Sequence, residues 1–334
     1  MLDNHWNTFV VLLRAGLWEQ DLALTTMPDE TEWSQIMQLA RTQGVMGLML
    51  RGLAHLPASQ QPPGSVQPDL VRWRTALERT YARHARVEAA LLEELSAACV
   101  HPVVQKGSEA AKYYPDPAMR QVGDIDLYCP EFDRARTIAP GARTASDGAA
   151  VFERDGVTIE LHPRYHDVHL PASQLPAPGT PCGELLLLSA HIFKHAMGAG
   201  VGCKQLCDLT LALTRLDGQY DKTLLQTTLR RAGLLRWHRL LCSLLVEDLG
   251  LNPACCLDGF RPRDPQPLRR IVREGGLFGK THRQQEKKQP ALKRKAAIAG
   301  SFLRRLPFSL RFGARETLAT IGGLALGNLS RKNY

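Results

Sequence analysis

The chain of 334 residues is 44% hydrophobic and 22% charged, values close to the globular averages, which excludes wholesale disorder. No run of 18 apolar residues occurs, and the N-terminus lacks a basic leader with a cleavage site, so we expect neither a spanning helix nor a signal peptide. The net charge of +9 is concentrated in residues 261–315, which hold 16 Lys and Arg against three acids, whereas residues 1–260 are mildly acidic.

The N-terminal part of the chain is predicted to be helical. Within residues 5–55, apolar side chains recur with helical spacing from Trp33 onward, and Thr31 is suited to cap that helix. The stretch 57–69 is rich in Pro, Gly and Ser, which predicts a loop. A long helix is expected at 70–99, because this stretch contains no Pro or Gly.

The periodicity changes after residue 100. Three short strands are predicted, at 102–105, 124–128 and 156–162. Between the first two, Ser108 is expected to cap a helix that ends before Pro115.

From Glu184 onward the pattern is helical again, with the expected helices at 184–197, 203–216, 221–232 and 234–250. The order of elements predicts an α+β fold in which a small core lies between N-terminal and C-terminal helical regions. The expected regions are a helical region at 1–100, an α/β core at 101–170, a second helical region at 182–260 and a basic, partly amphipathic tail at 261–334.

Three carboxylates are the most informative residues. Asp124 and Asp126 are two positions apart on a predicted strand, so both project from one face. Like charges this close are favourable only around a cation, and paired carboxylates suit Mg²⁺. Glu160, on another predicted strand, is placed to bring a third carboxylate beside them. Three carboxylates are able to hold two metal ions, one at an attacking hydroxyl and one at a triphosphate.

An isolated Asp-x-Asp is more often the exposed face of an edge strand, so two neighbouring features matter. Lys106-Gly107-Ser108 lies between a predicted strand and a helix, where glycine permits close approach of a phosphate. Arg120 precedes the aspartate pair and is suited to contact a phosphate or orient a carboxylate. The alternatives without a function are an ordinary strand-to-helix connection at Gly107-Ser108 and a surface ion pair at Arg120.

Together these residues resemble a known family. The stretch KGSEAAKYYPDPAMRQVGDIDLY (106–128) is similar to the family called uncharacterised nucleotidyltransferase, within the DNA-polymerase-β-like superfamily. Its pattern is Lys-Gly, Tyr-Pro-Asp-Pro, Arg and Gly-Asp-Ile-Asp-Leu. The stretch 159–162 (IELH) resembles the third-acid strand of that family, and 191–213 resembles its following helical region.

The resemblance implies a bacterial enzyme with a small mixed-sheet nucleotidyltransferase core. Such an enzyme moves a nucleoside monophosphate from an NTP to an acceptor and releases pyrophosphate. The resemblance implies that Asp124, Asp126 and Glu160 are catalytic and bind the metal, Mg²⁺ or Mn²⁺. It also implies that the nucleotide is bound by Lys106, Gly107, Ser108 and Arg120. The acceptor is left open among a saccharide, a peptide, a protein and RNA.

A second tier of candidate pocket residues comprises His162, His191, Lys194, His195, Lys204 and Asp208. His162 shares the strand face of Glu160, and His191 and His195 share one helix face. The two helical histidines lack the H-E-x-x-H form of a zinc site. They are expected to line the nucleotide or acceptor pocket, or to be ordinary polar positions.

The tail mixes basic clusters with apolar residues, namely Phe302, Leu303, Leu306, Phe308, Leu310 and Phe312. This mixture is typical of an anionic membrane surface contact through 261–315, although RNA or solvent alone also suits it. Pro307 is expected to divide any helix there into two short pieces.

Eight cysteines are scattered along the chain without a Cys-x-x-Cys pair, which is typical of reduced thiols. We therefore expect a cytoplasmic protein, either free or peripheral to the inner face of the membrane. Two functional alternatives stay open: a toxin or defence-type nucleotidyltransferase that acts on tRNA or protein, and a catalytically inactive nucleotide-binding module. The presence of all three acids argues against the inactive module.

Overall fold

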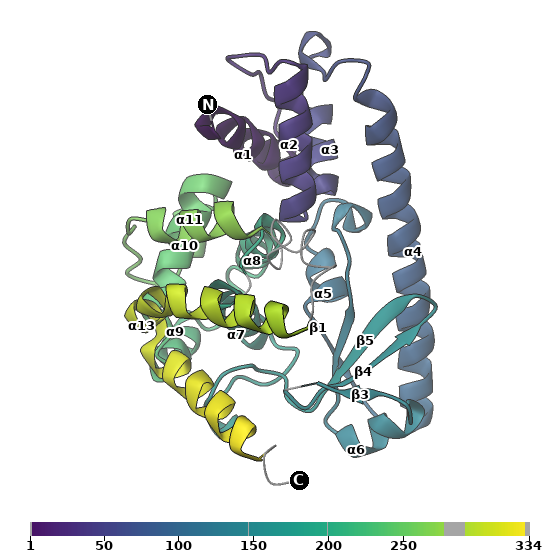
Figure 1. The fold of residues 1–334 in the computed structure, drawn as a ribbon, viewed down its shortest axis with the longest axis vertical. Coiled ribbons are helices and arrows are strands. Elements are labelled where there is room, and N and C mark those ends of the chain that lie inside the picture. Colours follow the sequence, from purple (N-terminus) through teal and green to yellow (C-terminus); the bar gives the residue numbers. More distant parts are fainter. Residues whose placement is uncertain (1, 146, 199, 277–290, 331–334) are drawn as a thin grey trace. The chain divides into compact units, whose positions relative to one another are not determined.

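The computed structural model describes residues 2–145, 147–198, 200–276 and 291–330. The chain divides into two compact units, Met1–Tyr165 and His166–Tyr334 (Figure 1).

The first unit opens with four helices. These are α1 (Leu2–Trp18), α2 (Glu30–Gln43), α3 (Met46–Ala54) and the long α4 (Gln67–Ala97), with the 3₁₀ turn η1 (Ala58–Gln60) before α4. The expected cap at Thr31 is wrong. Asp29 caps α2 instead, because its side chain accepts from the Glu32 amide while the Glu32 carboxylate accepts from the Asp29 amide.

A five-stranded mixed sheet follows, which confirms the α+β class. Its strands are β1 (Val103–Gln105), β2 (Ile125–Tyr128), β3 (Arg143–Thr144), β4 (Ala150–Arg154) and β5 (Val157–His162). The spatial order is β1-β2-β5-β4-β3, in which β2 and β5 are parallel and the other neighbours are antiparallel. The strands β3 and β4 were not expected from the sequence.

Alternation along the strands gives the sheet two different faces. Side chains at Ile125, Leu127, Ile159 and Leu161 are buried in one cluster with Leu91 of α4. One face of the sheet therefore packs on α4, and each such buried side chain contributes about 1.5–3 kcal/mol. The residues between them in sequence project from the opposite face.

Short elements connect the strands. They are α5 (Gly107–Ala111), η2 (Pro117–Met119), α6 (Phe132–Ala135) and η3 (Arg136–Ile138). The expected capping role of Ser108 is wrong: Lys106 is the residue that precedes α5, and no side chain caps this helix. The Ser108 hydroxyl donates a hydrogen bond to Glu88 of α4 instead.

The second unit is helical, as the sequence predicts. It contains η4 (Ala172–Gln174), α7 (Pro181–Met197), α8 (Cys203–Arg215), α9 (Lys222–Arg231), α10 (Leu235–Leu249), η5 (Pro253–Cys255), α11 (Gln266–Gly275) and α13 (Ala291–Ser330). Arg269 ties α11 to α10 through hydrogen bonds to both carboxylate oxygens of Asp248.

Helix α13 corrects two expectations about the tail. The chain stays helical through Pro307, and the two helical pieces of α13 meet instead at a kink at Gly313, whose backbone is not helical. Part of the predicted tail, residues 277–290, lies outside the described residues. Where its side chains are described, α13 is not a solvated tail, because Phe308 lies against the buried Trp237 ring and Phe312 is itself buried.

No helix in the described part of the chain combines the length and the apolar character that crossing a membrane requires.

Candidate active site

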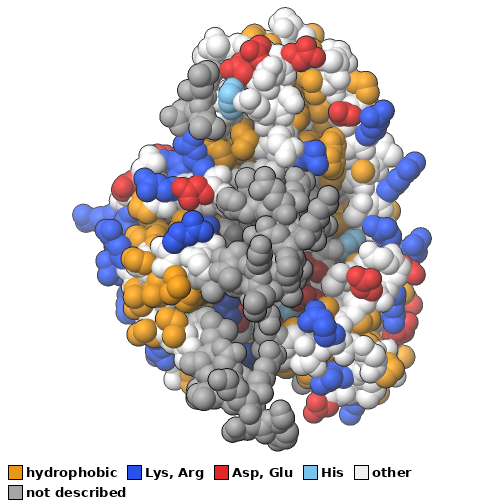
Figure 2. Space-filling model, viewed as in Figure 1, with side chains coloured by type: hydrophobic (Ala, Val, Ile, Leu, Met, Phe, Trp, Pro, Cys, Tyr) orange, Lys and Arg blue, Asp and Glu red, His pale blue; other side chains and the backbone are white. Residues whose placement is uncertain are grey.

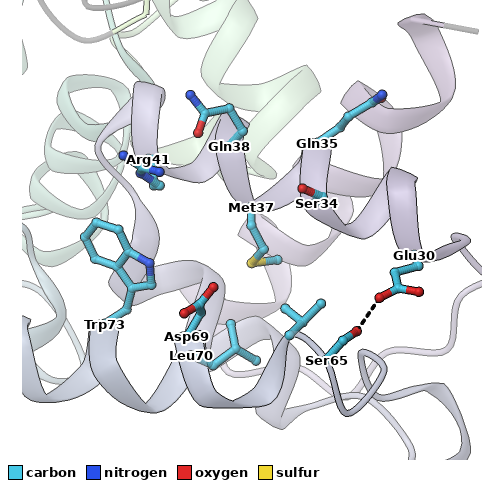
Figure 3. Close-up of a pocket in the computed structure, with 11 residues that line it drawn as sticks. Glu30, Ser34, Gln35, Met37, Gln38, Arg41, Ser65, Asp69, Leu70 and Trp73 are labelled. Atoms are coloured by element: carbon cyan, nitrogen blue, oxygen red, sulfur yellow. Dashed lines mark hydrogen bonds between the residues drawn. The ribbon is translucent and has the colours of Figure 1, made fainter. Parts of the chain in front are cut away.

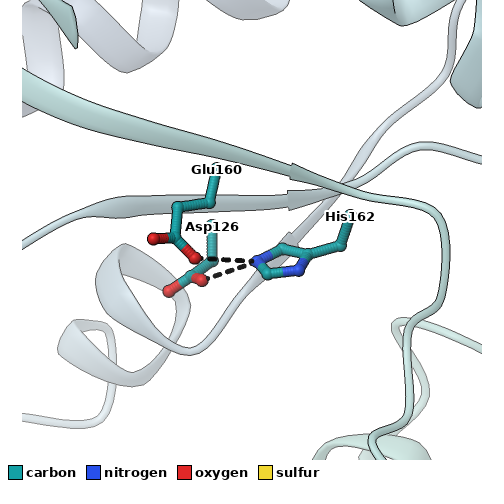
Figure 4. A group of neighbouring side chains, drawn as sticks. All are labelled: Asp126, Glu160 and His162. Atoms are coloured by element: carbon teal, nitrogen blue, oxygen red, sulfur yellow. Dashed lines mark hydrogen bonds and ion pairs between the residues drawn. The ribbon is translucent and has the colours of Figure 1, made fainter. Parts of the chain in front are cut away.

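Three potential metal ligands meet on the open face of the sheet. Asp126 on β2 is the register partner of Glu160 on the parallel strand β5, and His162 follows two residues later on β5 (Figure 4). Period-two alternation turns all three side chains away from the α4 core. Their ligand atoms all lie within 4.8 Å of one another. Two distant sequence segments are thereby brought to one point.

Asp126 is the most enclosed member of the group, with 5% of its surface exposed. Its Oδ1 atom accepts from Lys106 Nζ at 3.0 Å and from His162 Nε2 at 2.8 Å. His162 Nε2 also lies 3.6 Å from Glu160 Oε2, and His162 Nδ1 lies 3.9 Å from Asp147 Oδ2. One imidazole therefore lies against three carboxylates.

The pKa values of the Asp126 and Glu160 carboxyl groups are shifted in opposite directions. Burial raises the pKa of Asp126, but Lys106 and His162 outweigh it and hold that pKa well below its usual value. Burial and the charges of Asp126 and Asp124 raise the pKa of Glu160 above its usual value. Asp126 is thus a stable anion, and Glu160 is a carboxylate that takes up a proton more readily.

Lys106 stays charged at this site. Burial lowers its pKa, while the carboxylates of Asp126, Asp124 and Glu160 raise it, and the net result is a pKa above the usual value. Its backbone has a φ of 50°, in the left-handed region that side chains rarely adopt. This unusual backbone angle occurs where β1 ends and α5 begins.

Gly107, another of the predicted nucleotide residues, lies at the start of β2. Gln105 of β1 pairs with Asp126, so the turn that follows it approaches the start of β2. A Cβ atom on Gly107 would lie 3.5 Å from the Asp124 carbonyl oxygen. Asp124 immediately precedes β2 and is half-buried, and its carboxylate is not one of the three clustered ligands.

The Tyr-Pro-Asp-Pro segment is held by the N-terminal helices. Asp116 caps η2 by accepting from the Ala118 amide at 3.0 Å, and Arg51 of α3 lies 3.9 Å from the same carboxylate. A Cβ on Gly47 would lie 1.9 Å from the Met119 carbonyl oxygen, so only glycine permits this approach. Arg120, the next residue, is 4% exposed. Helix α3 thereby fixes the segment that leads into β2.

The second-tier residues other than His162 belong to the second unit. His191 and His195 on α7 are half-buried, with their Nε2 atoms 3.0 Å apart. Lys194, also on α7, forms an ion pair with Asp167. Lys204 and Asp208 lie on α8 and are buried. The predicted sharing of one helix face by His191 and His195 is therefore observed.

A separate cavity lies between α2 and the start of α4 (Figure 3). Its volume is about 520 Å³, and it contains Trp73 with the Arg41 guanidinium 5.3 Å from the ring centroid. Its rim carries the hydrogen bond from Ser65 to Glu30. None of the predicted site residues lines this cavity, so it is distinct from the carboxylate site.

The carboxylate site fits a divalent metal ion. Two carboxylates and an imidazole converge from adjacent strands, and all three residue types are common ligands of divalent cations. Burial raises the pKa of Glu160, and the charges of Asp126 and Asp124 raise it further; a bound cation relieves that repulsion between the carboxylates. No other group of three or more such side chains was found in the described ranges.

A small mixed sheet with acids on two adjacent strands, next to a Lys-Gly-Ser turn, is the arrangement expected of a nucleotidyltransferase. A model of the family "Uncharacterised nucleotidyltransferase" matches residues 29–250, about two thirds of the chain, and the chain belongs to this family. No curated protein matches the chain. No solved structure matches it either.

Two residues at the site were not found by sequence reasoning. Glu88 binds the Ser108 hydroxyl from α4, and Asp147 approaches His162 from the loop before β4. Neither residue lies within the motif that carries the resemblance. No local signal in the sequence singles them out.

Proposed function

We propose that the chain transfers a nucleoside monophosphate from an NTP to an acceptor and releases pyrophosphate. The observation that carries this proposal is the register pairing of Asp126 with Glu160 on adjacent strands, in a chain of a nucleotidyltransferase family. Because the family is uncharacterised, the reaction itself rests on the chemistry of these side chains.

Asp126 and Glu160, together with Asp124 and His162, would hold Mg²⁺ or Mn²⁺. When bound, such an ion neutralises triphosphate charge and favours ionisation of the attacking hydroxyl. The raised pKa of Glu160 suits it to accept the proton of that hydroxyl. The acceptor oxygen then bonds to the α-phosphorus, the bond to the bridging oxygen breaks, and pyrophosphate leaves.

Lys106, Gly107, Ser108 and Arg120 are proposed to bind the triphosphate. The Lys106 ammonium is a fixed positive charge beside Asp126, and it is held by a hydrogen bond. Gly107 leaves its backbone open to a phosphate because it has no side chain. Catalysis of this kind depends on positioning and on compensation of charge, as in phosphoryl transfer generally.

We also propose a cytoplasmic location. All eight cysteines are free, and seven of them are buried, which suits a compartment that keeps thiols reduced.

The test is incubation of the full-length protein with each α-labelled NTP, a divalent metal and a lysate, in parallel with γ-labelled NTP. Transfer of α-label without γ-label is expected, because a monophosphate moves and pyrophosphate leaves. Digestion of the labelled product with nuclease, protease or glycosidase then assigns the acceptor class and decides the alternative of a tRNA or protein target.

Asp126→Asn and Glu160→Gln are the variants that probe the site. Each is expected to lower transfer by about a hundredfold or more. Asp133→Asn changes an exposed acid on α6 and serves as the matched control. Undiminished turnover by a folded Asp126→Asn protein would refute the proposed mechanism.

A further inference from the structure

The structure shows which apolar residues of α13 face outward. Leu303, Leu310 and Leu318 are 64%, 38% and 60% exposed. The exposed residues Leu303, Pro307 and Leu310 recur at spacings of four and three before the kink at Gly313, and the exposed Ala314 and Leu318 are four residues apart after it, so each set lies on one side of its own helical piece. We call these five residues the outer face of α13.

The packing of α13 fixes which side faces outward. Ser309, Phe312 and Thr317 are buried, and Phe308 lies on the buried Trp237 ring. A Cβ atom on Gly313 would lie 2.3 Å from the Phe193 ring of α7, so the two helices touch closely here. The outer face therefore remains on the surface of the second unit.

Exposed arginines flank the outer face. Arg304, Arg311 and Arg315 lie along α13. Arg315 Nη1 donates to the Arg231 carbonyl oxygen at 2.6 Å, which brings the exposed Arg230 and Arg231 of α9 to the same region. Hydrophobic and basic side chains gather on the left of Figure 2, over the elements that Figure 1 labels α13 and α9.

No exposed acid offsets these charges on the described part of α13. Glu316 is the one acid within residues 300–323, and it is 2% exposed. Its carboxylate accepts from the amide of His169 at 2.8 Å and contacts His169 Nδ1 at 2.6 Å. The surface thus combines exposed leucines with a net positive charge.

We propose that the outer face of α13 and its flanking arginines dock the protein on an anionic lipid bilayer. The arginines meet the headgroup charges, and the leucines enter the boundary between headgroups and acyl chains. The leucines favour lipid over RNA, because non-specific RNA surfaces rely on exposed aromatic rings, whereas the Phe308 ring packs on Trp237 and Phe312, and Phe312 is buried.

The expected strength of vesicle binding follows from the arginines and leucines of this surface. Each basic residue near an anionic bilayer raises the partition coefficient about fivefold, and this gain falls as salt rises. The full-length protein is therefore expected to co-sediment with vesicles of phosphatidylcholine and phosphatidylglycerol at low salt. It should sediment less at high salt, and little with phosphatidylcholine alone.

Two variants separate the contributions. Leu303→Ser with Leu310→Ser removes exposed apolar groups, and Arg304→Gln with Arg311→Gln removes exposed charges, so neither pair disturbs the buried side of α13. Each pair is expected to weaken vesicle binding about tenfold or more. Val71→Ser with Arg74→Gln on α4 is the matched control, because both residues are exposed, and it should bind like the original chain.

The outcomes are decisive in both directions. Absence of sedimentation with anionic vesicles, or equal sedimentation of the original chain and both α13 variants, overturns the proposal. Retention of labelled RNA that is lost in the arginine pair, without any vesicle binding, assigns the surface to RNA and likewise overturns it. Asp126→Asn is expected to bind vesicles normally, so a failure of the transfer proposal leaves this test intact.

Discussion

Lys106 Nζ donates a hydrogen bond to Asp126 Oδ1 at 3.0 Å, and both side chains are largely shielded from solvent. A positive charge from the end of β1 is thereby built into the carboxylate site. Removal of one partner from a buried ion pair leaves the other charge uncompensated, so this contact stabilises the fold as well as arranging the site.

Replacement of Lys106 by Met should lower the free energy of unfolding at pH 7 by about 3 kcal/mol. The pKa of Asp126 is depressed in the folded chain, so its stabilising contribution is present above about pH 4 and is lost as the pH falls through the folded-state pKa. The raised pKa of Lys106 gives a contribution that is present below about pH 10.4 and is lost at higher pH.

Urea unfolding at about pH 7 and at several values from about pH 4 down to about pH 2 measures the effect, because the contribution of Asp126 is lost below about pH 4. The variant should lose less stability than the original chain as the pH falls, because Asp126 no longer has its main cationic partner. Lys112→Met, at an exposed lysine, is the control. Equal acid sensitivity of the Lys106 variant and the original chain would contradict this assignment.

His162→Gln should change which metal ion the site prefers. Imidazole nitrogen suits Mn²⁺ and Co²⁺, whereas Mg²⁺ prefers oxygen ligands. We expect Mn²⁺ affinity to fall about tenfold or more and Mg²⁺ affinity to change much less. Titration of free Mn²⁺ by electron paramagnetic resonance, with Mg²⁺ as competitor, measures both.

The exposed His101 supplies the control substitution, His101→Gln. A parallel loss of Mg²⁺ and Mn²⁺ affinity in His162→Gln would mean that His162 only orients Asp126 through the 2.8 Å contact.

Ser108→Ala should separate nucleotide binding from structural support. The Ser108 hydroxyl donates to Glu88, a carboxyl group whose pKa is raised by burial. If Ser108 also contacts the triphosphate, Ser108→Ala raises the KM for NTP about tenfold, whereas Glu88→Gln leaves it within about twofold. Steady-state kinetics of both variants and the double variant decide between these roles. Identical KM values in the two single variants would limit Ser108 to its contact with α4.

Gly313→Ala should destabilise the second unit by about 1–3 kcal/mol, because the new Cβ would lie 2.3 Å from the Phe193 ring. Gly322→Ala is the matched control in the same helix, since no atom lies within 4 Å of its added Cβ. That control should be neutral or stabilise by up to about 1 kcal/mol. Thermal unfolding compares the two variants, and equal melting temperatures would argue against the close contact of α13 with α7.

Strand positions and long helices were accessible from the sequence because they depend on local alternation and local breakers. The segments around Val103, Ile125 and Ile159 have such patterns, and the strands β1, β2 and β5 form there. By contrast, β3 has two residues and β4 five, too few to give a clear period. The parallel pairing of β2 with β5 joins segments separated by two other strands, which local patterns do not specify.

The sequence predicted those site residues that lie on the strands β2 and β5. Asp126 and Glu160 were expected together, and His162 followed from its shared face with Glu160. The placement of Ser108 against Glu88 depends on how α4 packs behind the sheet, which is a tertiary effect. The same holds for α13, where inward packing of Phe312 and outward exposure of Leu310 distinguish residues that look alike in the sequence.

The family match ends at residue 250, yet helices beyond it complete the second unit. Phe308 covers the Trp237 ring, and Gly313 lies against Phe193, two aromatic residues that belong to the matched region. A polypeptide cut at the end of the match would present both rings to water and would be prone to aggregate. The packing of the second unit therefore extends beyond the region that the family shares, and we expect a polypeptide that ends at residue 250 to be less soluble than the full chain.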